Sequence, residues 1–264
     1  MTEIFRLKQG KAPLLISFPH SGEALPDALR PRLTDEALTL DDTDFILPEL
    51  YDFAEEFGAS TIEANYSRYV VDPNRPPDDT SLYPGQNTTG IMPVMDFFGR
   101  ALYRPGMEPD DDERAARIQF YWKPYHDALA AELERQRAVH RAVLLWDAHS
   151  IRNNLPYLFA GTLPDLNIGT AAGASAAARV ETAVEQAARR SGAYSVITNG
   201  RFKGGYITRH YGRPSQGIHA VQLEMSKTIY LGHSQRPPLD ANRAIALRVT
   251  LRGMLRAALE ALAA

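Results

Sequence analysis

The chain contains an apolar run, Ala142-Val143-Leu144-Leu145-Trp146, that leads directly into Asp147-Ala148-His149-Ser150. A short apolar run of this kind predicts a buried strand, and the polar residues after it place potential chemistry at the strand's end. Residues 114–141, just before the run, carry apolar side chains at helical spacing and predict one long amphipathic helix. A long helix followed by a buried strand is typical of an α/β fold with a parallel sheet.

The same alternation continues on both sides of this stretch. Residues 73–106 are rich in Pro, Gly, Asp and Asn and predict a long functional loop. We expect one domain spanning residues 1–264: an α/β fold with a mixed, mostly parallel sheet, helices on both faces, and ligands bound at the carboxyl ends of the strands. Further strands are predicted at residues 13–18, 60–62, 69–71, 194–197 and 219–225, and further helices at 44–57, 170–190 and 240–262.

Composition excludes several classes of partner and site. The formal net charge is -3, which gives no overall attraction to nucleic acid or to an anionic membrane. The chain has no cysteine, so a bound metal would have to be held by His, Asp or Glu. Neither a secretory signal nor a long apolar span is visible, and we therefore expect a cytoplasmic protein whose partner is a small molecule.

Three polar residues, His20, His149 and Glu224, lie at or near the ends of apolar runs. Strand ends converge in an open α/β sheet, so residues that are distant in sequence can meet there. Two imidazoles and one carboxylate are a suitable ligand set for a catalytic zinc, which acidifies a bound water and polarises a carbonyl group. A second carboxylate is then needed to move the proton of that water, and Glu224 is the candidate for this general acid/base.

Spacing alone leaves the third protein ligand open. Glu23 follows His20 at the His-x-x-Glu spacing of zinc carboxypeptidases. Asp44 is the rival, although a carboxylate at the start of a predicted helix also has a purely structural use. Asp147 is expected to orient a ligand imidazole rather than to form a catalytic triad.

Six short segments stand out along nearly the whole chain: SFPHSG (17–22), YSRYVVDPNRP (66–76), YPGQN (83–87), DAHS (147–150), GGYIT (204–208) and QLEM (222–225). In this order they resemble the N-formylglutamate amidohydrolase (deformylase) family. The resemblance implies a zinc-exopeptidase-like α/β fold and metal-dependent hydrolysis of N-formyl-L-glutamate to formate and L-glutamate, a step of bacterial histidine degradation. Metal-bound water would attack the formyl carbon.

The resemblance also bears on single residues. An acid at the position of Asp44 is usual in the family, whereas the position of Glu23 is often not acidic. This favours His20, Asp44 and His149 as ligands, with Glu23 as the alternative. The implied substrate carries two carboxylates, which arginine binds in bidentate fashion. The candidates for substrate binding are Arg68, Asn74, Arg75, Asn87, Thr208 and Arg209.

Two alternatives stay open at this point. A related deacylase would keep the mechanism and act on an N-acetyl- or N-succinyl-amino acid, and the size of the pocket would decide between them. A non-catalytic protein would instead bind a dicarboxylic amino acid through its arginines without a metal. Such a binder would have no use for histidines at two strand ends.

Overall fold

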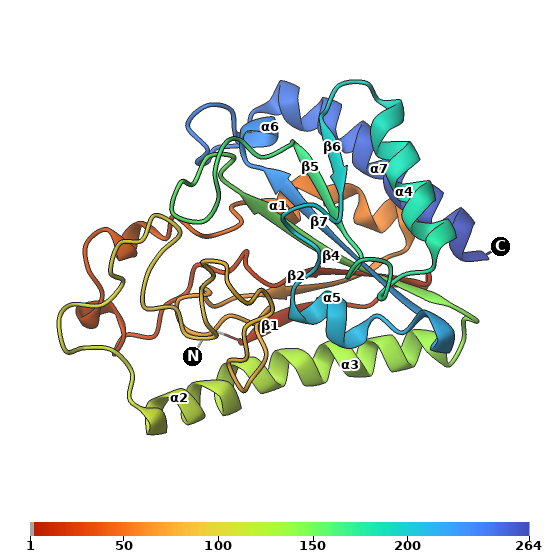
Figure 1. Cartoon of the computed structure of the whole chain (residues 1–264). Coiled ribbons are helices and arrows are strands. Elements are labelled where there is room, and N and C mark those ends of the chain that lie inside the picture. Colours follow the sequence, from red (N-terminus) through yellow and green to blue (C-terminus); the bar gives the residue numbers. More distant parts are fainter. Residues whose placement is uncertain (1–2, 264) are drawn as a thin grey trace.

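One mixed sheet of seven strands forms the centre of the protein in the computed structural model, which describes residues 3–263 (Figure 1). The strand order is β1-β3-β2-β4-β7-β5-β6. The neighbouring strands β3, β2, β4 and β7 run parallel, while β1 and the β5–β6 pair run antiparallel to them. This confirms the mostly parallel sheet expected from the sequence. The bounds are β1 Phe5–Lys8, β2 Leu14–Phe18, β3 Ser60–Ala64, β4 Val143–Ile151, β5 Leu166–Gly169, β6 Val196–Thr198 and β7 Ile218–Ser226.

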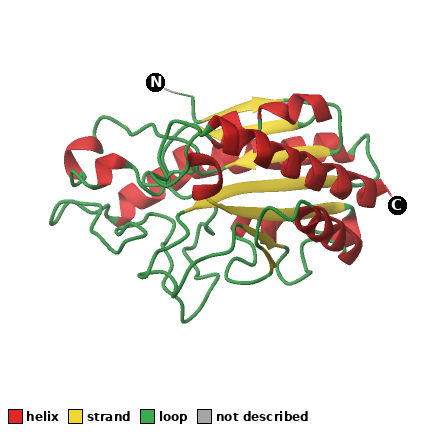
Figure 2. Ribbon diagram, turned by 90° about the horizontal axis from the view of Figure 1, so that it is seen from above, coloured by secondary structure: helices red, strands yellow, loops and turns green. Residues whose placement is uncertain are grey.

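Helices cover both faces of the sheet, also as expected (Figure 1). One face packs against α3 (Lys123–Arg137) through an apolar cluster that joins Leu145 to Leu129 and Leu133. The other face packs against α4 (Ala178–Arg190) and α7 (Ala241–Ala263) through a larger cluster that includes Leu144 and Trp146. Most of the long loops gather beyond one end of the sheet (Figure 2). No helix within residues 3–263 has the length and apolar content needed to cross a bilayer.

The helices vary widely in length. The α-helices are α1 Leu47–Leu50, α2 Asp111–Arg117, α3 Lys123–Arg137, α4 Ala178–Arg190, α5 Tyr206–Tyr211, α6 Thr228–Leu231 and α7 Ala241–Ala263. Short 3-10 helices are η1 Arg30–Arg32, η2 Ala37–Thr39, η3 Asp52–Phe57 and η5 Pro214–Gln216, and a π-helical turn, η4 Ile118–Trp122, joins α2 to α3. The long helix predicted at 114–141 is therefore a continuous helical stretch that changes its winding at η4 and ends at Arg137.

Two other helix predictions are partly wrong. Residues 44–57 form only α1 and η3, because Ile46, just before α1, has a left-handed backbone with φ of 51°. The helix predicted from residue 170 begins at Ala178. Ala171 and Ala172 have positive φ values, which a right-handed helix does not allow.

The strand predictions need three corrections. Residues 69–71 do not form a strand. The chain turns at residues 67–70, where Val70 N donates to Ser67 O at 2.9 Å, and Tyr69 and Val70 pack in a separate apolar cluster. The sequence does not predict β1 or β5, which have four residues each and are too short to show an alternating pattern. Strand β4 continues to Ile151, so His149 lies within the strand instead of after it.

The carboxyl-terminal halves of β4 and β7 carry polar side chains on the face that α3 covers. Successive strand residues point to opposite faces, so Asp147 and His149 share one face, as do Gln222 and Glu224. The parallel register places Asp147 beside Gln222 and His149 beside Glu224. The apolar cluster on this face therefore gives way to four buried polar side chains at the carboxyl ends of the two strands.

Candidate active site

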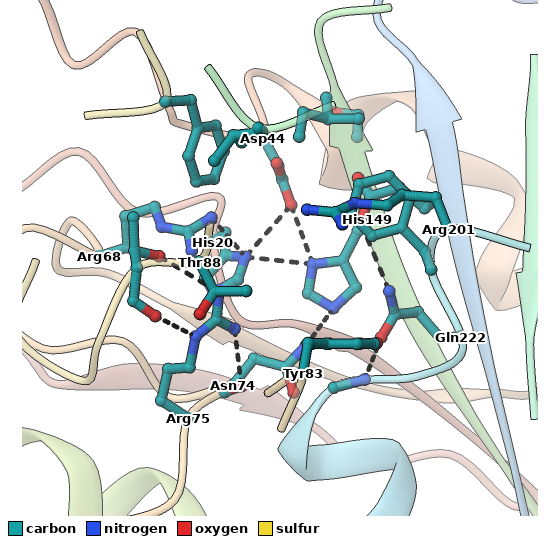
Figure 3. Close-up of a pocket in the computed structure, with 18 of the residues that line it drawn as sticks. His20, Asp44, Arg68, Asn74, Arg75, Tyr83, Thr88, His149, Arg201 and Gln222 are labelled. Atoms are coloured by element: carbon teal, nitrogen blue, oxygen red, sulfur yellow. Dashed lines mark hydrogen bonds and ion pairs between the residues drawn. The ribbon is translucent and has the colours of Figure 1, made fainter. Parts of the chain in front are cut away.

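Three buried side chains converge at the carboxyl ends of the central strands (Figure 3). Nδ1 of His20 lies 3.1 Å from Nδ1 of His149. Oδ2 of Asp44 lies 3.2 Å from the His149 nitrogen and 3.7 Å from the His20 nitrogen. Within the described residues, this is the one group of His, Asp or Glu side chains arranged to hold a metal ion.

The backbone explains how the three residues meet. His149 projects from β4, and His20 follows the end of β2. The chain returns to His20 at Asp44, whose backbone N donates to His20 O at 2.9 Å. The fully buried Lys227 fixes the same loop, since its Nζ donates to the carbonyl oxygen of Asp41 at 3.1 Å.

A further carboxylate holds each imidazole from behind. Nε2 of His20 lies 2.6 Å from Oδ1 of Asp72, and Nε2 of His149 lies 3.1 Å from Oδ2 of Asp147. A carboxylate accepts hydrogen bonds and does not donate them, so Asp72 and Asp147 each favour a proton on the Nε2 that they face. Nδ2 of Asn74 also lies 2.9 Å from Nε2 of His149. The Nδ1 lone pairs then face the carboxylate of Asp44. Three electron-pair donors that face one another can share one cation, so these residues fit a divalent metal.

The spacing also fits the size of zinc. Bonds of about 2.0–2.1 Å to nitrogen and oxygen, arranged tetrahedrally, place neighbouring ligand atoms about 3.3 Å apart. The observed separations of 3.1, 3.2 and 3.7 Å lie around that value. A site with three protein ligands keeps a fourth position for solvent or substrate, which is typical of catalytic rather than structural zinc.

The charges around the two rings differ. Burial, assisted by the Arg68 cation, lowers the pKa of His20 to about 4, so this ring is neutral at pH 7. Burial also favours the neutral form of His149, but the carboxylates of Asp147 and Asp44 outweigh it and raise the pKa of that ring. The same negative charge that stabilises a proton on His149 also stabilises a metal cation.

Glu224 faces the pocket from the strand next to His149. Burial raises the pKa of its carboxyl group to about 8, although the nearby His149 lowers it. Its Oε2 lies 3.4 Å from Nε2 of Gln222, whose Oε1 accepts a hydrogen bond from Gly205 N at 2.7 Å. Glu224 is thus a buried carboxyl group whose pKa is raised towards neutral pH.

Four of the six predicted substrate-binding residues line the pocket in front of these side chains, namely Arg68, Asn74, Arg75 and Asn87. Thr208 and Arg209 do not line it. Thr208 is fully buried behind the site, with Oγ1 3.4 Å from Oδ2 of Asp147. Arg209 is exposed on α5, where its Nε donates to Gly204 O at 2.8 Å, so the prediction that it faces substrate is not supported.

Three residues of the site were not assigned a role from the sequence. Asp72 is the outer partner of His20, and Gln222 links Glu224 to the backbone. Arg201 lines the pocket where Arg209 was expected. The available signals were weak: Asp72 and Gln222 lie within family-like segments, and Arg201 precedes the Gly204-Gly205 turn.

Glu23, the alternative ligand, is placed elsewhere. Its side chain is exposed and lines a separate surface hollow that also includes Arg6 and Glu63. Asp44 approaches the histidines instead, because its backbone is hydrogen-bonded to His20.

Asn74 connects the pocket to the start of α5. Its Oδ1 accepts a hydrogen bond from Ile207 N at 2.9 Å, and its Nδ2 lies 3.3 Å from Oδ2 of Asp147. Gly205 passes so close that a Cβ at this position would lie 2.4 Å from the Asn74 amide nitrogen. A larger residue at position 205 would displace Asn74 from the pocket.

Fold and site together define an α/β enzyme with a buried histidine–carboxylate cluster suited to a divalent cation. The chain belongs to the N-formylglutamate amidohydrolase family, whose model matches residues 12–231. It is accordingly an amidohydrolase, an enzyme that cleaves amide C–N bonds.

Individual relatives agree with this assignment. The N-formylglutamate deformylase of Pseudomonas aeruginosa is 49% identical over 255 residues, which are 97% of this chain and 96% of the relative. That of Pseudomonas putida is 45% identical over 259 residues, or 98% and 97% of the two chains. The crystal structure of N-formylglutamate amidohydrolase from Ralstonia eutropha JMP134 has the same fold, with a TM-score of 0.81, 24% identity and 96% of each chain covered.

Proposed function

We propose that this protein hydrolyses N-formyl-L-glutamate to formate and L-glutamate with the help of a bound zinc ion. The observation that carries the proposal is the meeting of His20, His149 and Asp44 in a pocket that also contains Glu224 and arginine side chains. A group of side chains that can hold a metal for hydrolysis, with arginine side chains beside it, suits an amide substrate that carries carboxylate groups. The substrate named for the two Pseudomonas relatives has this chemistry.

His20, Asp44 and His149 would hold the metal, with Asp72 and Asp147 orienting the two imidazoles. When bound, a divalent cation acidifies water and polarises the scissile carbonyl group.

Glu224 moves the protons in this proposal. Its carboxylate takes a proton from the attacking water, and the resulting carboxylic acid passes that proton to the amine of the leaving glutamate. A pKa raised by burial suits both halves of this task, because the group must gain and lose a proton within one turnover near neutral pH.

Arg68 and Arg75 provide positive charge at the metal end of the pocket (Figure 3). Nη1 of Arg68 lies 3.2 Å from Nδ1 of His20, so this guanidinium lies where negative charge would develop on the formyl oxygen. Its buried Nε has no hydrogen-bond partner within residues 3–263. Arg75 and the adjacent Asn74 are suited to the α-carboxylate, which is bonded to the same carbon as the scissile amide nitrogen.

The test is an assay of formate release from N-formyl-L-glutamate by the metal-loaded enzyme, the chelated enzyme and the chelated enzyme after zinc is restored. We expect release that is lost on chelation and recovered with about one zinc per chain. N-acetyl-L-glutamate, which adds one methyl group, is the matched substrate. No formate from the loaded enzyme, or faster release of acetate, would refute the assigned substrate, and full activity of metal-free protein would refute the role of zinc.

A further inference from the structure

The arginines of the pocket differ in what balances their charge. Arg68 is paired with the carboxylate of Asp72, its Nη2 lying 2.5 Å from Oδ2. Arg75 lies 3.8 Å from the same oxygen and also donates from Nε to Thr89 O at 2.6 Å. Both cations therefore have a buried carboxylate of the protein beside them.

Arg201 has no such partner. Its guanidinium donates to Oε1 of Gln86 and, at 3.2 Å, to the backbone oxygen of Asn87, and both acceptors are neutral. No carboxylate forms an ion pair with Arg201 anywhere in the chain from residue 3 to residue 263. Burial lowers the pKa of this guanidinium, as expected for a partly desolvated cation without a counter-charge. Such a group gains more from an incoming carboxylate than a cation that is already paired.

The contacts of Arg201 place it at the rim of the pocket. Its two partners, Gln86 and Asn87, belong to the loop before α2, and Nδ2 of Asn87 donates to Tyr157 O at 2.8 Å. Tyr83 of the same loop donates to Gly204 O at 2.8 Å. Residues 83–87, which we call the rim loop, are thus hydrogen-bonded to the segment that carries Arg201, and these bonds hold the guanidinium in place.

Arg201 also differs from Arg68 and Arg75 in the charged groups that surround it. The negative charges that act on Arg75 include Asp72 and Glu224, whereas no carboxylate among residues 3–263 acts appreciably on Arg201. Arg201 still lines the same pocket as the metal-binding residues, and Figure 3 shows it there. Arg68 and Arg75 share the carboxylate of Asp72, which is hydrogen-bonded to the metal-binding His20, whereas Arg201 is bonded to residues 86 and 87 at the rim.

A glutamate derivative likewise has one carboxylate beside the reacting amide and one further from it. The α-carboxylate is attached next to the scissile amide, and the side-chain carboxylate lies two methylene groups further out. We infer that Arg201, held by Gln86 and Asn87, binds the side-chain carboxylate of the substrate and so makes the enzyme selective for dicarboxylic amino acids. This inference rests on the proposed function and assigns the specificity of the same pocket to one residue.

The test compares two substrates that differ only at the side-chain terminus, N-formyl-L-glutamate and its neutral amide analogue N-formyl-L-glutamine. Arg201→Met should lower kcat/KM for formylglutamate by about 10- to 100-fold, mainly through KM, because a charge-assisted contact to a non-reacting group is lost. The same variant should change kcat/KM for formylglutamine by less than about threefold. Arg201→Lys should recover part of the loss, since it restores charge without the bidentate fork.

Lys203→Met is the matched control. Lys203 lies two residues away on the same segment, is exposed and does not line the pocket, so its replacement removes one positive charge without touching the inferred contact. Wild-type kinetics in this variant would exclude a general effect of net charge. Metal content should equal that of the wild type in every variant.

The possible outcomes distinguish the two claims. If the wild-type enzyme releases no formate from formylglutamate, the proposed function fails. If it does so, but Arg201→Met slows both substrates equally, the function stands and the inference about Arg201 is wrong. An equal loss in Lys203→Met would also overturn it, because the effect would then be long-range electrostatics.

Discussion

Replacing Asp147 with Asn isolates the electrostatic contribution of one outer carboxylate to metal binding. The side chain is fully buried, with Oδ2 3.1 Å from Nε2 of His149 and Oδ1 3.2 Å from Oγ of Ser17. In the variant, the amide oxygen can keep the bond to His149 while the amide nitrogen faces Ser17. The Ser17 hydroxyl can accept that bond, because its other partner, Tyr125 OH at 3.0 Å, can donate to it.

The shape of the site is therefore kept and one negative charge is lost. Outer partners of this kind typically contribute 10- to 100-fold to metal affinity, or about 1.4–2.7 kcal/mol. We expect Asp147→Asn to raise the Kd for zinc by about that factor, while the Tm of the metal-free protein changes by only a few degrees.

The assay is a zinc titration of metal-free protein against a competing chromogenic chelator, together with thermal unfolding of the metal-free form. Ser17→Ala is the control, since it removes a hydrogen bond to Asp147 and leaves the charge, and its Kd should change by less than about threefold. An unchanged Kd in Asp147→Asn would refute the claim that this carboxylate acts through His149. A large fall in Tm would show that its role is structural.

The remaining predictions concern the base and the third ligand. Glu224→Gln should retain one zinc per chain but lower kcat by about 10²- to 10⁴-fold, as measured by formate release, and a kcat within tenfold of the wild type would exclude Glu224 as the general base. Asp44→Asn should lose zinc on gel filtration in dilute chelator, whereas Glu23→Gln should keep both zinc and activity. Zinc loss in the Glu23 variant with retention in the Asp44 variant would reverse the assignment of the third ligand.

The sequence by itself determined the fold class and the two histidines. The apolar runs of β4 and β7 predict buried strands, and the polar residues at or after the ends of these runs mark where chemistry can occur. Because the ends of parallel strands meet, His149 and Glu224 could be brought together without coordinates. The motif order along the chain gave the family, which the family match then confirmed.

The local sequence pattern predicted the wrong secondary structure where contacts with distant segments determine the backbone. The apolar run at 69–71 has the composition of a strand, but it packs in separate apolar clusters and not in the sheet. Residues 170–177 have helix-forming composition, yet positive φ at Ala171 and Ala172 keeps them out of α4. Composition indicates that a segment is buried or favours a helix, but tertiary contacts determine its backbone conformation.

Only the tertiary structure decided which polar side chains share the pocket. Asp44 and not Glu23 lies beside the histidines because a backbone hydrogen bond returns the chain to His20. Arg201 and not Arg209 enters the pocket because α5 carries Arg209 to the surface, while the rim loop holds Arg201. The physical reason is common to both pairs: sequence spacing fixes the direction of a side chain only within one regular element, and these residues lie in or after loops whose path depends on contacts distant in sequence.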